Sequence, residues 1–166
     1  MSLPPTPPGP SRRTSDWEAS RWIDTGTVDL SAIEQLFVAG IPFNSFVGLE
    51  LLEIERGRAL ARIKFRPELI GDPTRPALHG GVISMLVDTI GGAAVFSVTD
   101  PGDRVATIDL RVDYLLPGRE ADVYAEAVLI RVGNRVGVAS MRCWQPETPG
   151  EDPIAVAKGV YTIKRS

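Results

Sequence analysis

The chain of 166 residues is long enough for one domain with a sizeable core, and its 43% apolar and 23% charged residues are typical of an ordinary globular protein. A net charge of −3 at pH 7 gives no electrostatic basis for binding nucleic acid or an anionic membrane, and we expect neither as a partner. The single cysteine, Cys143, excludes an intrachain disulfide, and no apolar run reaches the roughly 18 residues that a membrane span requires.

The N-terminal segment differs in composition from the rest of the chain. It has five prolines in its first ten residues, which favours an extended or disordered conformation. We therefore predict a flexible arm over residues 1–27 and a single domain over residues 28–166. Since this segment has no apolar signal-peptide core, we expect a cytoplasmic protein.

Residues 29–65 predict a short helix followed by a hairpin. Apolar residues recur at helical spacing over residues 29–39, and Gly40 with Pro42 ends that pattern. Residues 42–46 then predict a turn. Two strand-like runs over residues 47–65 flank Gly57 and are typical of a β-hairpin.

The rest of the chain predicts a loop, a long helix and four strands. Prolines and a glycine over residues 67–77 indicate a loop without regular elements. A helix follows over residues 82–98, and turn signals then separate strands expected at 104–116, 122–132, 135–145 and 153–164. Tight turns between consecutive strands favour an antiparallel sheet, so we predict an α+β fold in which a six-stranded sheet wraps around one long central helix.

The long helix begins at an unusual motif. The only histidine of the chain, His79, is followed by Gly80 and Gly81 and then by an apolar segment whose single acidic residue is Asp88. A core-facing stripe is expected at Ile83, Leu86, Val87, Ile90, Ala93 and Ala94. Asp88 lies about 140° from the centre of that stripe at 100° per residue, on a second face that is also nearly apolar. A carboxylate there is costly unless it has a partner or a task.

These residues resemble those of the hotdog-fold acyl-CoA thioesterases, in the subgroup of the phenylacetate-pathway thioesterase and the human thioesterase superfamily members. The resemblance rests on Leu78-His79-Gly80-Gly81 at the start of a helix, on Asp88 within it, and on the following strand Ala106-Thr107-Ile108-Asp109-Leu110. It covers residues 42–163 and implies the hotdog fold. It also implies an acyl-CoA substrate, no metal or other cofactor, and a homodimer or homotetramer with sites at the dimer interface.

The resemblance also implies roles for individual residues. The helical acid of such enzymes is the catalytic carboxylate, as general base or nucleophile, and corresponds to Asp88. The backbone N–H that binds the thioester carbonyl corresponds to Gly80, with Gly81 adjacent. His79 would support that turn and Thr107 would orient the water, although an ordinary strand threonine on the polar face fits equally well.

Two further residues are candidates for substrate binding. Relatives commonly have an Asn or Gln about six residues before the histidine, where this chain has Pro73 preceded by Asp72. Asp72 would therefore have to take that role, or the role is absent. The resemblance also implies that Arg135, in the turn after Gly133-Asn134, contacts CoA phosphates as basic residues near this position do in relatives, although a solvated turn arginine is an equal alternative.

The spacing of the motif has its own consequence. Gly81 and Asp88 are about 10.5 Å apart along a helix at 1.5 Å per residue, too far for one carbonyl carbon to contact both. Two antiparallel copies of the helix would bring the N-terminus of one beside the acid of the other. We expect Gly91 and Gly92 to let such helices approach closely.

Other functions fit less well. The sequence lacks a Gly-x-Ser-x-Gly elbow, a P-loop and a dinucleotide-binding glycine motif, and one histidine with one cysteine argues against a zinc site. A hotdog hydratase or dehydratase and a non-catalytic acyl-CoA-binding module remain as alternatives. Cys143 alternates with Met141 and Ala139 and is expected to be core packing.

Overall fold

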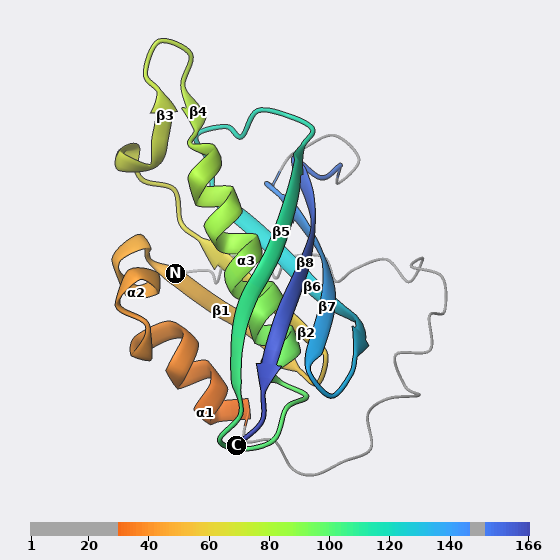
Figure 1. The fold of residues 1–166 in the computed structure, drawn as a ribbon. Helices are drawn as coiled ribbons and strands as arrows, with labels where there is room; N and C mark the ends of the chain where they lie inside the picture. Colours follow the sequence, from red (N-terminus) through yellow and green to blue (C-terminus); the bar gives the residue numbers. More distant parts are fainter. Residues whose placement is uncertain (1–29, 147–151) are drawn as a thin grey trace.

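A six-stranded antiparallel sheet curls around one long helix in the computed structural model, which describes residues 30–146 and 152–166 (Figure 1). The helix is α3 (Gly80–Phe96), and the strand order is β1-β2-β6-β7-β8-β5. The strands are β1 (Leu49–Glu55), β2 (Arg58–Ile63), β5 (Arg104–Tyr114), β6 (Val123–Val132), β7 (Val136–Trp144) and β8 (Ala155–Lys164). The predicted architecture is confirmed, while the arm predicted over residues 1–27 lies outside the described residues.

The core lies between α3 and the concave face of the sheet. All six residues of the predicted stripe on α3 are buried. The central strands β2, β6 and β7 face them with small side chains, which lets the helix lie close to the sheet: Ala59, Ala61, Ala125, Ala127 and Ala139 are all inaccessible to solvent. Cys143 is packed in the same layer as predicted, and burial raises the pKa of its thiol to about 12.

The N-terminal helical segment is longer than predicted. It comprises α1 (Leu30–Gln35), a π-helical turn η2 (Leu36–Gly40) and α2 (Pro42–Val47). The prediction of a turn over residues 42–46 is wrong, because Pro42 occupies the first turn of a helix, where its missing N–H costs nothing. Gly48, with φ of 75°, then ends α2 in the left-handed conformation.

The segment preceding α3 is also more regular than predicted. Residues 67–77 contain a 3₁₀ turn η3 (Pro67–Leu69) and the strand β3 (Ile70–Asp72), and they end in β4 (Ala77–Leu78). The prediction of a loop without elements is therefore wrong. The Asp72 carboxylate makes the difference, since it accepts hydrogen bonds from the N–H and hydroxyl of Thr74 at 2.9 and 2.6 Å and so closes the β3–β4 hairpin.

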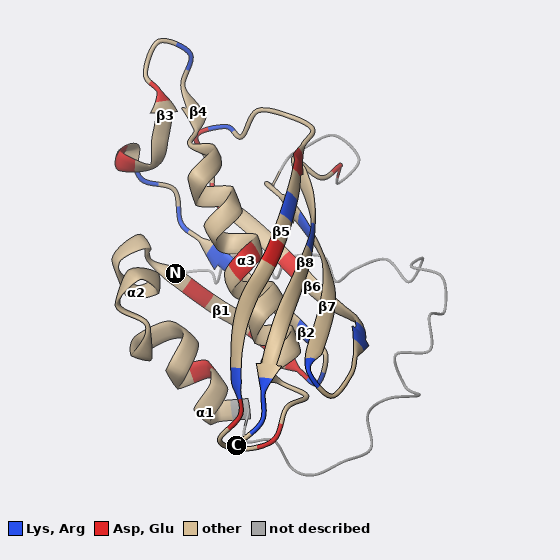
Figure 2. Ribbon diagram, in the orientation of Figure 1, with Lys and Arg blue, Asp and Glu red and all other residues tan. Residues whose placement is uncertain are grey.

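Opposite charges are interspersed over the sheet (Figure 2). On its convex face the nearly buried Glu126 of β6 receives Arg58 Nε at 2.8 Å on one carboxylate oxygen and Arg142 Nε at 2.9 Å on the other. These two ion pairs link β6 to its neighbours β2 and β7. In the described parts of the chain, none of the helices has both the length and the apolar character needed to cross a membrane.

Candidate active site

His79 fixes the start of α3. Its backbone is extended, with φ of −62° and ψ of 130°, and its Nδ1 accepts a 2.9 Å hydrogen bond from the Gly81 N–H, so the imidazole is the N-cap of the helix. The His79 N–H donates to the Leu69 carbonyl at 2.8 Å and thereby joins this cap to η3. The imidazole and the backbone N–H of His79 thus connect the start of α3 to the segment that precedes it.

The two glycines of the motif differ in what their N–H groups do. The Gly81 N–H is already used by the His79 cap. A Cβ at position 81 would lie 2.8 Å from His79 Nδ1, so glycine is required there by the cap. The Gly80 N–H points out of the first helical turn and has no acceptor within residues 30–146 and 152–166. Gly80 is therefore the free donor at the positive end of the α3 dipole.

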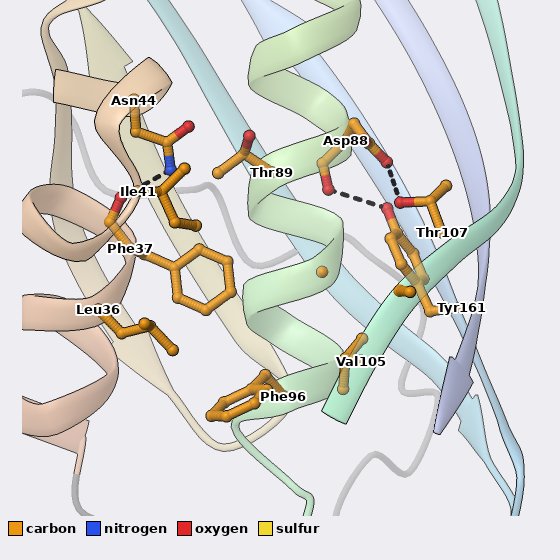
Figure 3. A pocket seen from close by; sticks show the side chains of 12 residues that line it. Leu36, Phe37, Ile41, Asn44, Asp88, Thr89, Phe96, Val105, Thr107 and Tyr161 are labelled. Carbon is orange, nitrogen blue, oxygen red and sulfur yellow. Dashed lines mark hydrogen bonds between the residues drawn. The ribbon is translucent and has the colours of Figure 1, made fainter. Parts of the chain in front are cut away.

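Asp88 lies two turns further along α3 and is half-buried. Its Oδ1 accepts a 2.9 Å hydrogen bond from the Thr107 hydroxyl on β5, and its backbone carbonyl accepts one of 3.1 Å from the Tyr161 hydroxyl on β8 (Figure 3). In the described parts of the chain no other side chain donates to the carboxylate, so Oδ2 is free to act on a ligand. Asp88 and Thr107 were both predicted, and the structure brings them together.

Thr107 reaches Asp88 because β5 contains a β-bulge. Thr107 pairs with Tyr161 but Asp109 pairs with Val160, so Ile108 is an extra residue and the side-chain alternation reverses at that point. Thr107 therefore lies on the helix-facing side, and the prediction that it belongs to the polar face is wrong. Ile108, the extra residue of the bulge, is 58% exposed.

Tyr161 was not recognised from the sequence. Its ring is buried against α3, and burial, followed by the charge of Asp88, raises the pKa of its hydroxyl. Two glycines make room for it: a Cβ at Gly91 would lie 2.1 Å from the Tyr161 hydroxyl, and one at Gly159 would lie 2.5 Å from it. Gly91 thus serves this tyrosine within one chain, rather than the approach of two helices that we had expected of it.

A cavity of about 280 Å³ opens beside Asp88. It lies between α3, the N-terminal helical segment and the start of β5 (Figure 3). Asp88 and Thr107 form its polar end, while most of its wall is apolar: Leu36, Phe37, Ile41, Gly92, Phe96, Val105 and Ala106. The contribution of η2 and α2 was not foreseen, because the cavity is a space between segments far apart in the sequence.

A second cluster surrounds Gly80. The Tyr114 hydroxyl, from the end of β5, donates to the Gly80 carbonyl at 3.0 Å and shares a short hydrogen bond with the Ser84 hydroxyl. Since each hydroxyl has one proton, Ser84 donates either to the Tyr114 oxygen or to the same carbonyl, which is 3.1 Å away. These hydroxyls hold the peptide group that follows the free Gly80 N–H. Tyr114 was given no role from the sequence.

Asp72 and Arg135 are not part of the cavity wall. The Asp72 carboxylate is engaged by its own hairpin, and the side-chain hydrogen bond from Thr74, followed by the backbone ones, lowers its pKa. Arg135 is exposed in the β6–β7 turn, where its carbonyl accepts from the Ile163 N–H at 2.7 Å. Within one chain, the structure therefore does not bring either predicted substrate-binding residue to Asp88.

Comparison with known proteins identifies relatives over most of the chain. The family model of the Thioesterase superfamily matches residues 76–150. The chain is 34% identical over 146 residues to the medium/long-chain acyl-CoA thioesterase YigI of Salmonella typhimurium, and the alignment covers 80% of this chain and 91% of that protein. The protein of the same name from Escherichia coli K12 is 33% identical, with the same coverage.

Solved structures show the same arrangement of elements. A crystal structure of a thioesterase superfamily protein superposes with a TM-score of 0.74 at 31% identity, covering 82% of this chain and all of that one. The Escherichia coli PaaI protein from the phenylacetic acid degradation operon superposes with a TM-score of 0.72 at 17% identity, covering 82% of this chain and 94% of that one. At that identity, the second likeness shows a shared fold alone.

Proposed function

Since the chain belongs to the thioesterase superfamily and is a thioester hydrolase with the hotdog fold, we propose that it cleaves an acyl-CoA to the free acid and CoA. The observation that carries this proposal is the position of Asp88, a carboxylate held by Thr107 at the polar end of an otherwise apolar cavity. A thioester carbonyl beside Asp88 would leave its acyl group against the apolar wall, which suits a hydrocarbon.

The chemistry needs a nucleophile and a stabilised oxyanion. Asp88 acts either as a general base that removes a proton from water, or as the nucleophile that forms an anhydride which water then cleaves. Thr107 uses its one proton on Asp88 Oδ1, and its oxygen lone pairs remain to accept from a water molecule. In both routes one water molecule is consumed, and CoA leaves as its thiol by taking up a proton from that water.

The oxyanion donor in this proposal is the Gly80 N–H. It lies at the N-terminus of α3, where the helix dipole favours negative charge. Gly80 and Asp88 of one chain are about 12 Å apart along the helix at 1.5 Å per residue, so they cannot act on one carbonyl. We propose that Gly80 of one subunit acts with Asp88 of the other.

The edge strand β5 supports such a dimer. Among the described residues it is paired on one side only, with β8, so its other edge presents backbone groups without a partner strand there. Several large apolar side chains along or just beyond it are exposed: Ile108, Tyr114, Leu115 and Leu116. Pairing of β5 with its copy in a second subunit would satisfy that edge, cover these side chains and place two α3 helices side by side.

Mixed dimers test this shared site. Gly80→Pro removes only the proposed donor, because proline fits the first helical position and the extended His79 tolerates a following proline. Asp88→Asn removes the carboxylate, and we expect each variant alone to lose activity by about 100-fold or more. Refolding the two together in equal amounts should restore about a quarter of wild-type activity, because half of the dimers are mixed and each has one intact site. Two inactive variants that stay inactive when mixed, at unchanged Tm, would overturn the shared site.

The acyl group is best tested with a panel of acyl-CoAs and release of free thiol. The relatives named for medium and long chains make an aliphatic acyl group of medium length our first choice, ahead of the aromatic groups also considered from the sequence. Turnover that depends on Asp88 would support the hydrolase. Tight binding without turnover would favour a binding module instead, and hydration of an enoyl-CoA would favour a hydratase.

A further inference from the structure

The cavity beside Asp88 contains one polar group that hydrolysis does not use. Asn44 of α2 lies in its wall and is only 2% exposed. Its Nδ2 donates a 2.7 Å hydrogen bond to the Phe37 carbonyl. Because a carbonyl can only accept, the amide atom facing it must be the NH₂ group, which fixes the orientation of the side chain.

The Asn44 oxygen consequently points the other way. Figure 3 shows it turned from the Phe37 carbonyl toward α3 and Thr89. Among residues 30–146 and 152–166, no group donates a hydrogen bond to this oxygen. The Thr89 hydroxyl also lies in the cavity wall, and within the described part of the chain its hydrogen bonding is limited to a weak contact with Met85 Sδ at 3.7 Å.

A structural role explains the NH₂ group of the Asn44 side chain but not its amide oxygen. The NH₂ group satisfies the Phe37 carbonyl at the π-helical turn, where the ordinary helical acceptor pattern is interrupted. The oxygen has no such task, yet a wholly apolar ligand that covered it would leave a buried acceptor unpaired. Such a ligand should bind about tenfold more weakly than one that supplies a donor.

We propose that Asn44 is a specificity residue that accepts a hydrogen bond from a hydroxyl on the acyl group, so that the preferred substrates are hydroxyacyl-CoAs. A hydroxyl suits this position because it donates to the Asn44 oxygen and can accept from Thr89. The surrounding wall of Leu36, Phe37 and Ile41 suits the hydrocarbon part of the same group. This inference rests on the proposed thioesterase function and specifies its substrate class.

The position of the hydroxyl follows from the course of the cavity along α3. Asp88, Gly92 and Phe96 line it at successive turns, over about 12 Å at 1.5 Å per residue, and Thr89 is the neighbour of Asp88. The hydroxyl is therefore expected within the first few carbons from the thioester carbonyl, rather than at the far end of the chain.

The test compares pairs of substrates of equal chain length. Octanoyl-CoA is measured beside 2-, 3- and 4-hydroxyoctanoyl-CoA, and the readout is the ratio of kcat/KM between each hydroxy ester and the saturated one. For one isomer the wild-type ratio should be about ten or more, and it should fall to about one in Asn44→Ala, with a smaller fall in Thr89→Val. Asn134→Ala, in the exposed β6–β7 turn, is the matched control and should leave the ratio unchanged.

The ratio of kcat/KM separates recognition of the hydroxyl from a loss of structure, because a general destabilisation lowers the rates on the hydroxy ester and on octanoyl-CoA together. A wild-type preference for octanoyl-CoA over every isomer would overturn the inference while leaving the thioesterase intact. So would a preference for one hydroxy ester that Asn44→Ala leaves unchanged, because the preference would then not depend on Asn44. Absence of turnover on all four esters and on saturated esters of other lengths would instead overturn the proposed function itself.

Discussion

The Thr107 hydroxyl on β5 donates a 2.9 Å hydrogen bond to Oδ1 of Asp88 on α3, and so connects the edge strand with the long helix. Only one carboxylate oxygen is held in this way, which orients the other one toward the cavity. Thr107 therefore positions the Asp88 carboxylate, and it does so from the strand that we propose as the dimer interface.

Replacing Thr107 tests this contact directly. Thr107→Val keeps the shape of the side chain and removes the hydroxyl, so we expect kcat to fall about 2- to 10-fold, which corresponds to the loss of one hydrogen bond. Thr107→Ser keeps the hydroxyl and should retain most of the activity. Steady-state kinetics on the best acyl-CoA checks this, and a loss in Thr107→Ser with full activity in Thr107→Val would show that the methyl group matters rather than the hydrogen bond.

The two adjacent glycines of α3 should respond differently to substitution. A Cβ at Gly91 would meet the Tyr161 hydroxyl at 2.1 Å, whereas the nearest atom to a Cβ at Gly92 is at an ordinary 3.6 Å. Gly91→Ala should therefore lower the free energy of unfolding by about 1–3 kcal/mol through overpacking. Gly92→Ala should leave it unchanged or raise it by up to about 1 kcal/mol through helix propensity.

Urea unfolding measures the free energy of unfolding of both glycine variants. Combining Gly91→Ala with Tyr161→Phe then shows whether the two positions are energetically coupled. If the clash with the hydroxyl is the cause, Gly91→Ala should cost less in the Tyr161→Phe background than in the wild type. Rescue should be partial, since the Tyr161 Cζ atom would still be 2.9 Å from the new Cβ. Additive effects would show that Gly91 is needed for another reason.

Tyr114 is expected to matter for the rate rather than for binding. Its hydroxyl holds the Gly80 carbonyl at 3.0 Å, next to the N–H that we propose as oxyanion donor. Tyr114→Phe should lower kcat about 2- to 10-fold with little change in KM. Tyr124→Phe is the control, because Tyr124 lies away from the cavity. Its ring stacks on the ring of Trp144, with 6.0 Å between the two centroids. A change in KM alone would contradict a positioning role for Tyr114.

A buried carboxylate near the C-terminus makes the free energy of unfolding depend on pH in the acid range. Asp103 accepts hydrogen bonds from the Ser166 N–H at 3.1 Å, the Asp100 N–H at 3.0 Å and Arg165 at 2.6 Å. Burial alone would raise its pKa, but these hydrogen bonds and the Arg165 charge outweigh it and hold the pKa of Asp103 below its usual range. The stabilisation is therefore complete above the unfolded pKa of about 3.9 and is lost as the pH falls through the lower folded value.

Thermal unfolding of Asp103→Asn across pH checks this sign. The variant should have a lower Tm than the wild type at pH 7, and the difference should shrink as the pH falls below about 4. The exposed Glu34→Gln serves as the control and should follow the wild type throughout. A Tm difference that stays constant into acid would mean that Asp103 contributes through packing and not through its charge.

The sequence by itself determined the helices and strands whose apolar residues recur with a regular period. The buried stripe of α3 and the strands β1, β2, β5, β6, β7 and β8 were predictable, because helical and strand periodicities of apolar residues are local properties. The motif from His79 to Asp88 was equally accessible, since its residues lie on one helix or at its start. Even the need for a second subunit followed from the rise of that helix alone, and it stays a prediction.

Only the tertiary structure decided which side chains meet across elements. Thr107 faces Asp88 because of a bulge that depends on the partner strand β8, and strand alternation alone gave the wrong face. The Gly81 N–H proved to be occupied by the imidazole of His79, which depends on the φ and ψ of the cap. Asn44 and Tyr161 reached the site from segments distant in sequence, because a cavity is shaped by packing between elements and leaves no periodic signal in any one of them.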